Sequence, residues 1–182
     1  MHLELEKRKK NKLRQKFFKK NGGLLLKQQI SSTSKGGVEK TKLYTIEELE
    51  KATDNFNAGR VLGKGGHGKV YKGMLLDGSI MAIKKSIIVE ERQVVEFVYE
   101  VFILCQINHR HIVKLLGCCL ESEVPLLVYE YVSNSTLSHH LHNQDHASTL
   151  SWEKRLRIAD EIAGAVAFHM LLQLSFIGMS SL

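Results

Sequence analysis

The spacing of apolar positions divides the chain into helical and extended segments. Over residues 90–105 and again over 152–166, apolar side chains recur about every 3.6 positions, which predicts two helices that each bury one face. Short runs of β-branched and aromatic residues predict strands at positions 70–71, 80–83, 112–118 and 125–131, with polar turns between them. The pattern therefore indicates an α+β chain.

A shorter helix is indicated near residue 46 by its start signals. Thr45 is followed three positions later by Glu48, which is the spacing of a capping box, and Tyr44 can pack on Leu49 across the first turn. We expect this helix to run to about Thr53. Residues 43–60 should then form a short helix and a linker.

Charge is distributed unevenly along the chain. The net charge of +7 comes from residues 1–42, which carry 13 Lys and Arg against 3 Glu (+10), whereas the remainder carries 13 against 16 (−3). The stretch KRKKNKLRQKFFKK has little apolar surface, so we expect residues 1–42 to be a basic disordered segment. It is either a solvated charge run or a segment attracted to an anionic membrane surface. Nothing in it supports nucleic acid as the partner, since it offers no aromatic platform or recognition motif.

Cysteines and histidines do not predict a metal site. Cys105, Cys118 and Cys119 make an odd count without metal-ligand spacing, and we interpret them as buried thiols. The histidines at 139, 140, 142 and 146 lack a carboxylate or cysteine that would complete a ligand set. No run of about 18 apolar residues occurs, so we expect a cytoplasmic chain.

The glycine-rich stretch VLGKGGHGKVYKGMLLDGSIMAIKKS carries the functional signal. Gly63, Gly65 and Gly68 form G-x-G-x-x-G, which alone is a weak motif because glycines also mark ordinary turns. A dinucleotide-binding turn would open a helix, but strand-forming residues follow here, and Ala82-x-Lys84 comes at the end of the next strand. This order is typical of a protein kinase phosphate-binding loop.

The residue types suit a bound triphosphate. A hairpin tip built from Gly65, Gly66 and Gly68 can present backbone N–H groups to phosphates without interference from β-carbons. Val70 and Ala82 supply small apolar surfaces for an adenine ring. Strand alternation places Lys84 on the face of Ala82, so Lys84 rather than Lys85 should reach the α- and β-phosphates.

The chain resembles plant receptor-like kinases, and most closely the wall-associated kinase group. The resemblance rests on KFFKKNGGLLL, YTIEELEKATDNF, QINHRHIVKLLGCCLESEVPLLVYEYV and LSWEKRLRIADEIAGA, and it runs from about Lys7 to Ala167. It implies a protein-kinase-like N-lobe over 61–132, with a five-stranded antiparallel sheet and an αC helix, followed by an incomplete helical C-lobe over 133–167. It also implies a Ser/Thr kinase module at the cytoplasmic face of the plasma membrane, with residues 1–42 as the juxtamembrane segment.

The resemblance assigns further roles. Glu100 would pair with Lys84, with Glu96 as the alternative; Tyr129 would be the gatekeeper; and the Glu130 carbonyl and Val132 amide would bind adenine. The predicted cofactor is ATP, and the residues expected to contact it are Leu62, Gly63, Gly65, Gly66, Gly68, Val70, Ala82, Lys84, Tyr129, Glu130 and Val132.

The final residues depart from the family pattern. Residues 168–182 read FHMLLQLSFIGMSSL, and the printed sequence contains neither His-Arg-Asp nor Asp-Phe-Gly. A one-base shift of the reading frame near His169 would explain this. The family uses Mg²⁺, but the ligands for it are absent here, so we predict an inactive lobe with only the supporting residues Lys84 and Glu100. The alternative function is a non-enzymatic lobe that binds a membrane surface or a partner. The sequence identifies no protein substrate.

Overall fold

The computed structural model describes residues 2–33, 41–65, 68–86, 98, 101–105, 107–142 and 150–179. The chain divides into two compact units, and each is described by itself. The first unit comprises residues 1–106 and 114–131, and the second comprises 107–113 and 132–182. The boundary after Tyr131 lies within one residue of the predicted end of the N-lobe at 132, and residues 107–113 belong to the second unit.

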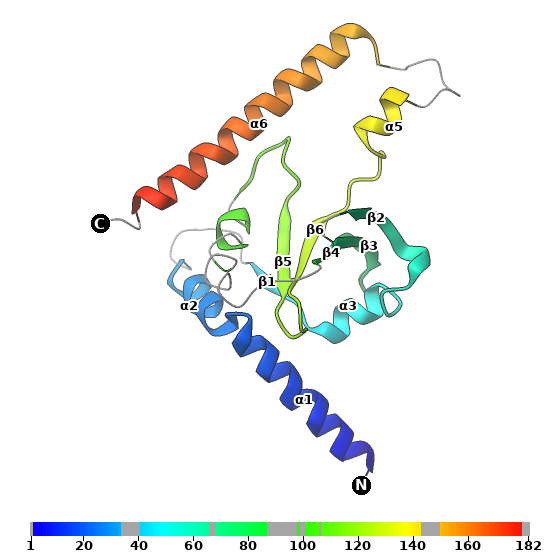
Figure 1. Ribbon diagram of the computed structural model, residues 1–182, viewed down its shortest axis with the longest axis vertical. Helices are drawn as coiled ribbons and strands as arrows, with labels where there is room; N and C mark the ends of the chain where they lie inside the picture. The colour runs from blue at the N-terminus through cyan, green and yellow to red at the C-terminus, as the bar shows by residue number, and fades with distance from the viewer. Residues whose placement is uncertain are drawn as a thin grey trace. The chain divides into compact units, whose positions relative to one another are not determined.

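A six-stranded sheet forms the centre of the first unit (Figure 1). Its strands lie in the order β1-β5-β6-β4-β3-β2, and every neighbouring pair is antiparallel except β1 and β5. The five antiparallel strands confirm the prediction, whereas β1 was not predicted. The strand bounds are β1 Lys42–Leu43, β2 Val61–Gly65, β3 Gly68–Met74, β4 Ile80–Ser86, β5 Leu115–Cys119 and β6 Leu126–Glu130.

The two faces of the sheet carry separate hydrophobic cores. On one face, Met81, Ile83 and Val128 pack with α3 (Ile46–Ala52). On the other face, Leu115, Cys118 and Leu127 pack with Val98 and with helical residues 101–105. Alternation along β6 produces this division, because Leu126 and Val128 point one way and Leu127 the other. Residues 101–105 lie in the predicted 90–105 helix, most of which is outside the described residues.

The helix α3 forms as its sequence predicts. Thr45 Oγ1 accepts from the Glu48 backbone N–H, and Glu48 Oε2 accepts from the Thr45 backbone N–H at 2.7 Å, so the capping box is present. Ile46 and Leu49 face the core. The helix ends in a turn where Asp54, Asn55 and Phe56 all adopt positive φ, and a short 3₁₀ helix, Ala58–Arg60, leads into β2.

The N-terminal segment is helical, so the prediction of disorder for residues 1–42 is wrong for most of it. Two helices form there, α1 (His2–Lys20) and α2 (Gly23–Thr33). The connection between them is anchored by Asn21, whose buried Nδ2 donates to the carbonyls of Leu120 and Ser122 at 3.1 and 2.8 Å. Leu26 of α2 is fully buried in the core that contains residues 101–105. These contacts supply the stabilisation that the local composition lacks.

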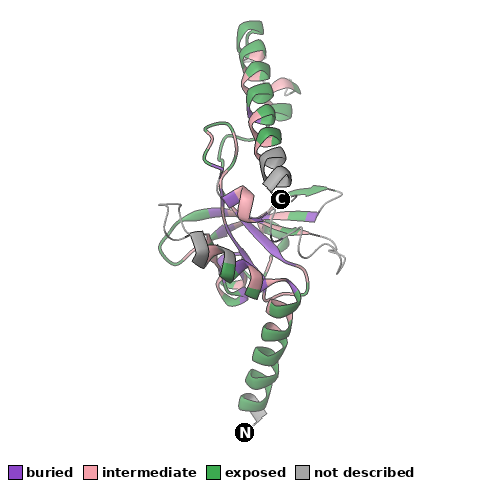
Figure 2. Ribbon diagram, turned by 90° about the vertical axis from the view of Figure 1, so that its left-hand side faces the viewer, coloured by how far each residue is buried: buried purple, intermediate pink, exposed green. Residues whose placement is uncertain are grey.

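The second unit contains α5 (Leu137–His142) and the long α6 (Trp152–Met179). The predicted helix from 152 to 166 is present but continues to Met179. His111 Nε2 lies 3.6 Å from Glu161 Oε2, and the ring of His109 stacks on Phe168. The helix is exposed along much of its described length (Figure 2), and its exposed side chains include large apolar ones. Among the described helices, none combines the length and hydrophobicity needed to cross a bilayer.

The three cysteines are buried free thiols, as predicted. Cys118 and Cys119 are neighbours in β5, so their side chains lie in the two different cores, and Cys105 lies in the same core as Cys118. Burial raises the pKa of all three thiols, and it raises that of Cys119 to about 12.

Candidate nucleotide-binding site

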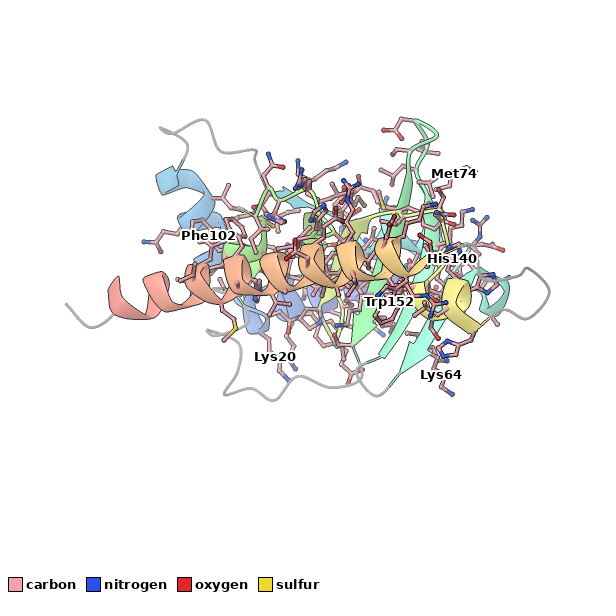
Figure 3. The ribbon with its side chains drawn as sticks, turned by 90° about the horizontal axis from the view of Figure 1, so that it is seen from above. Lys20, Lys64, Met74, Phe102, His140 and Trp152 are labelled. Atoms are coloured by element: carbon pink, nitrogen blue, oxygen red, sulfur yellow. The ribbon has the colours of Figure 1, made fainter. Side chains whose placement is uncertain are left out.

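The glycine-rich motif forms the hairpin at the β2 edge of the sheet. Gly63 pairs with Val70, Lys64 with Lys69, and Gly65 with Gly68, and the register shifts between Val61 and Gly63 so that Leu62 is unpaired. Lys64 projects from this hairpin into solvent (Figure 3). Gly66, which we predict to cover a phosphate, lies outside the described residues.

The glycines of the hairpin differ in what the fold requires of them. Gly68 adopts φ +135°, and a β-carbon there would collide with the Lys85 carbonyl, so the fold itself requires glycine. A β-carbon at Gly63 or at Gly65 would meet no atom of the described residues within 4 Å. Packing against the described part of the lobe therefore does not explain these two glycines. A ligand that needs close approach to the backbone would explain them.

The predicted adenine and phosphate residues lie on one face of the sheet. Val70 is the cross-strand partner of Lys84, and Ala82 is the partner of Tyr129. Directly opposed residues in antiparallel strands share a face, so Val70, Ala82, Lys84 and Tyr129 do so. All four side chains are half-buried. The register thus brings together residues that are up to 59 positions apart in the sequence (70 to 129).

Lys84 and Lys85 point to opposite faces. Lys84 pairs with Leu127, whose side chain belongs to the core that contains residues 101–105. Lys85 Nζ instead lies 5.0 Å above the ring of Phe56, which packs on the other core. Of these two lysines, therefore, only Lys84 lies on the face of Val70 and Ala82.

Glu100 and its alternative Glu96 lie outside the described residues, so their pairing with Lys84 stays a prediction. The residues beside position 100 support it. Val98 and Val101 are buried with Leu127 on the sheet face of Lys84. The described residues on either side of position 100 thus pack on the sheet face of Lys84.

The strand end that we predict to bind adenine is fixed by its neighbour. The Glu130 backbone N–H donates to the Lys114 carbonyl at 3.0 Å, and the Lys114 backbone N–H donates to Glu130 Oε1 at 2.8 Å. Tyr129 packs against the core that contains residues 101–105. Val132 is exposed, and it is the first residue of the 132–182 segment of the second unit.

Sequence reasoning missed two residues beside this site. Lys72 pairs with Ala82 and so shares its face, and Lys72 Nζ lies 4.9 Å above the Tyr131 ring. The Glu130 side chain holds β6 to the residue preceding β5. Alternation from Val70 would have identified Lys72, whereas no local signal indicates the Glu130 contact.

A separate groove lies between α1, α2 and the start of α3. It has a volume of about 370 Å³, and both signs of charge line it: Arg14, Lys19 and Lys27 are basic, and Glu47 and Glu121 are acidic. These residues do not include any of the predicted nucleotide contacts. The mixed charge gives no clear preference for an anionic ligand.

Comparison with known proteins decides the family. Residues 56–174 match the family model described as protein tyrosine and serine/threonine kinase. The chain belongs to this kinase family. The match extends seven residues beyond 167, where we expected the resemblance to end.

The most similar relatives of this kinase chain include wall-associated receptor kinases of Arabidopsis thaliana, which confirms the resemblance seen in the sequence. Wall-associated receptor kinase-like 1 is 57% identical over 164 residues, and wall-associated receptor kinase-like 3 is 60% identical over 153 residues. These matches cover 90% and 84% of this chain but only 22% and 21% of the relatives. The chain thus spans about a fifth of their length.

Solved structures show the same kinase fold. The pseudokinase DRIK1, in a co-crystal with ENMD-2076, matches with a TM-score of 0.60 and 28% identity, covering 73% of this chain and 53% of DRIK1. The pseudokinase domain of BIR2 matches with a TM-score of 0.52 and 36% identity, covering 65% of this chain and 35% of that domain. Both neighbours are described as pseudokinases, and DRIK1 is described as an inactive kinase.

Proposed function

We propose that the kinase lobe binds ATP on the face formed by Val70, Ala82, Lys84 and Tyr129, under the β2–β3 hairpin. The observation that carries this proposal is the combination of Lys84 on the shared face with Gly63 and Gly65, which the fold does not require. Phosphates would contact the hairpin backbone and Lys84. Adenine would lie between Val70 and Ala82 and would bond to the Glu130 carbonyl and the Val132 amide.

We also propose that this chain does not transfer the phosphoryl group. The printed sequence contains neither a His-Arg-Asp nor an Asp-Phe-Gly motif, so it lacks the aspartate that accepts the substrate proton in protein kinases. In the described part of the chain, no three His, Cys, Asp or Glu residues gather to hold a metal ion. We therefore include no Mg²⁺-dependent step in this proposal. The pseudokinase neighbours support the same proposal.

In the whole protein, the lobe would belong to a receptor-like Ser/Thr kinase at the cytoplasmic face of the plasma membrane. The similarity to wall-associated receptor kinases supports this proposal. A second candidate function, favoured by the basic helix α1, is a non-enzymatic lobe that binds an anionic membrane surface.

Titration of a fluorescent ATP analogue tests nucleotide binding. Lys84→Met removes the cation on the site face, and we expect it to weaken binding about 10- to 100-fold because charge-assisted hydrogen bonds to the phosphates are lost. Lys85→Met is the matched control, since Lys85 faces Phe56, and it should leave the affinity unchanged.

Either of two results would contradict the proposal. One is a folded wild-type lobe that does not bind the analogue. The other is equal weakening by Lys84→Met and Lys85→Met, because the site would then not lie on the Lys84 face. Circular dichroism on each variant shows whether it is folded.

A further inference from the structure

One face of α1 is docked on the lobe. Arg14 Nη2 lies 2.8 Å from Glu47 Oε1, and Lys10 Nζ lies 3.8 Å from Glu50 Oε2. The Arg14 guanidinium beside Glu47 holds the pKa of this carboxyl below its ordinary value. Phe18 packs against the core that contains residues 101–105. Together with Asn21, which ends the same stripe, these contacts fix the rotation of α1 about its axis.

The opposite face of α1 is basic. At about 100° per residue, the positions more than about 110° away from Arg14 include six basic residues, all of them exposed: Arg8, Lys9, Lys12, Lys16, Lys19 and Lys20. No acidic residue lies among them, since Glu4 and Glu6 are at the flanks of the helix. We call these six residues the outer basic face. Figure 2 shows that α1 is exposed along most of its length.

We propose that the outer basic face binds anionic lipid headgroups, while the docked face holds the kinase lobe in a fixed orientation to the membrane. This inference refines the membrane-binding part of the proposed function and does not depend on nucleotide binding. A row of cations along a straight helix about 28 Å long suits a flat, negatively charged surface.

The composition of the two faces favours lipid over nucleic acid. Leu5 lies on the same side of α1 as the outer basic face and is 52% exposed, so an apolar side chain can enter the headgroup region between the lysine stems. Single-stranded nucleic acid would need aromatic platforms. The aromatic Phe18 instead packs on the lobe, with Lys27 Nζ 4.8 Å above its ring.

Two variants with the same change in charge test the inference on the full chain. Lys12→Gln with Lys16→Gln removes two charges from the outer basic face, and Lys10→Gln with Arg14→Gln removes two from the docked face. Binding is measured to vesicles of phosphatidylcholine containing phosphatidylserine, with pure phosphatidylcholine as the control. Thermal unfolding is measured in parallel, and so is binding to duplex DNA.

We expect the two variants to separate the two roles. The outer-face variant should bind anionic vesicles about 30-fold more weakly than wild type, since each basic residue contributes about fivefold, and it should unfold at the wild-type temperature. The docked-face variant should unfold at a lower temperature and bind vesicles about tenfold more tightly than the outer-face variant. Added salt should weaken all of this binding.

Three results would overturn the inference. The first is equal loss of vesicle binding in both variants, which would mean that the net charge of α1, and not the face that carries it, determines binding. The second is unchanged vesicle binding in the outer-face variant. The third is loss of DNA binding with vesicle binding retained, which would make the face a nucleic-acid surface. Nucleotide affinity, measured on the same samples, tests the proposed function separately.

Discussion

At the scale of single residues, the hairpin glycines separate what the fold needs from what a ligand needs. Gly68 is required by its positive φ and by the Lys85 carbonyl beside it, whereas Gly65 has open space where a side chain would lie. A search for glycine motifs treats the two positions alike. The structure predicts that they behave differently on substitution.

Gly68→Ala should destabilise the lobe and Gly65→Ala should not. We expect Gly68→Ala to cost about 1–3 kcal/mol or more, because alanine is strained at that φ and its β-carbon meets backbone. Gly65→Ala should leave stability within about 1 kcal/mol of wild type but weaken binding of an ATP analogue about tenfold or more. Urea unfolding and analogue titration measure both effects. Unchanged affinity in folded Gly65→Ala would argue against phosphate contact at this position.

Residue-scale sequence reasoning succeeded where strand alternation decides the outcome. The separation of Lys84 from Lys85 follows from the period of two along β4, and the structure shows it. The contact from Glu130 to the Lys114 backbone could not be predicted in this way. The two residues are 16 positions apart, and their contact depends on the register of β6 against β5 and the residue before it.

At the scale of elements, the capping box of α3 has a testable pH dependence. The backbone N–H of Thr45 donates to Glu48, and this hydrogen bond lowers the pKa of Glu48 below 4.5. A carboxyl group whose pKa is lowered by folding stabilises the fold at pH values above 4.5, and the stabilisation is lost as the pH falls through the folded pKa.

Glu48→Ala should therefore destabilise the chain by about 1 kcal/mol at pH 7, and the difference from wild type should shrink as the pH falls below 4.5. Urea unfolding at several pH values measures this. Lys51→Ala on the same helix is a control, because Lys51 is exposed and lies outside the capping box. A difference that does not depend on pH would show that the Glu48 carboxylate charge plays no part.

Elements with local signals could be predicted, and elements that depend on distant partners could not. Thr45 and Glu48 specify α3 within four residues. The helices α1 and α2 instead depend on Asn21, whose acceptors lie 99 and 101 positions away. The strand β1 has only two residues, and it pairs with β5 because Gly117 lets the Lys42 backbone approach where any β-carbon would collide. Neither the docking of α1 and α2 nor the pairing of β1 with β5 can be predicted from the residues nearby in the sequence.

At the scale of the whole molecule, the exposed side of α6 governs behaviour in solution. Trp152, Leu156, Val166 and Met170 follow one stripe of the helix, and each is more than half exposed. A continuous apolar surface of this kind favours association. The sequence predicts the helix itself, from the period of its apolar residues.

The chain should therefore self-associate in a concentration-dependent way, and Leu156→Gln with Val166→Gln should shift it toward monomer. Sedimentation velocity over a range of concentrations measures this. Arg157→Gln, which breaks the 3.1 Å contact to Glu161 on the polar side of the helix, serves as the control. A wild-type chain that stays monomeric at high concentration would show that this stripe does not drive association.

The buried cysteines allow transient opening of the first unit to be measured through their chemical reactivity. A thiol reacts with alkylating reagents as the thiolate, and burial with a raised pKa suppresses that form in the folded state. Because Cys118 and Cys119 lie in different cores, their alkylation rates count how often each side of the sheet becomes accessible to reagent. The two native cysteines thus report separately on the opening of the two cores, and no label has to be introduced.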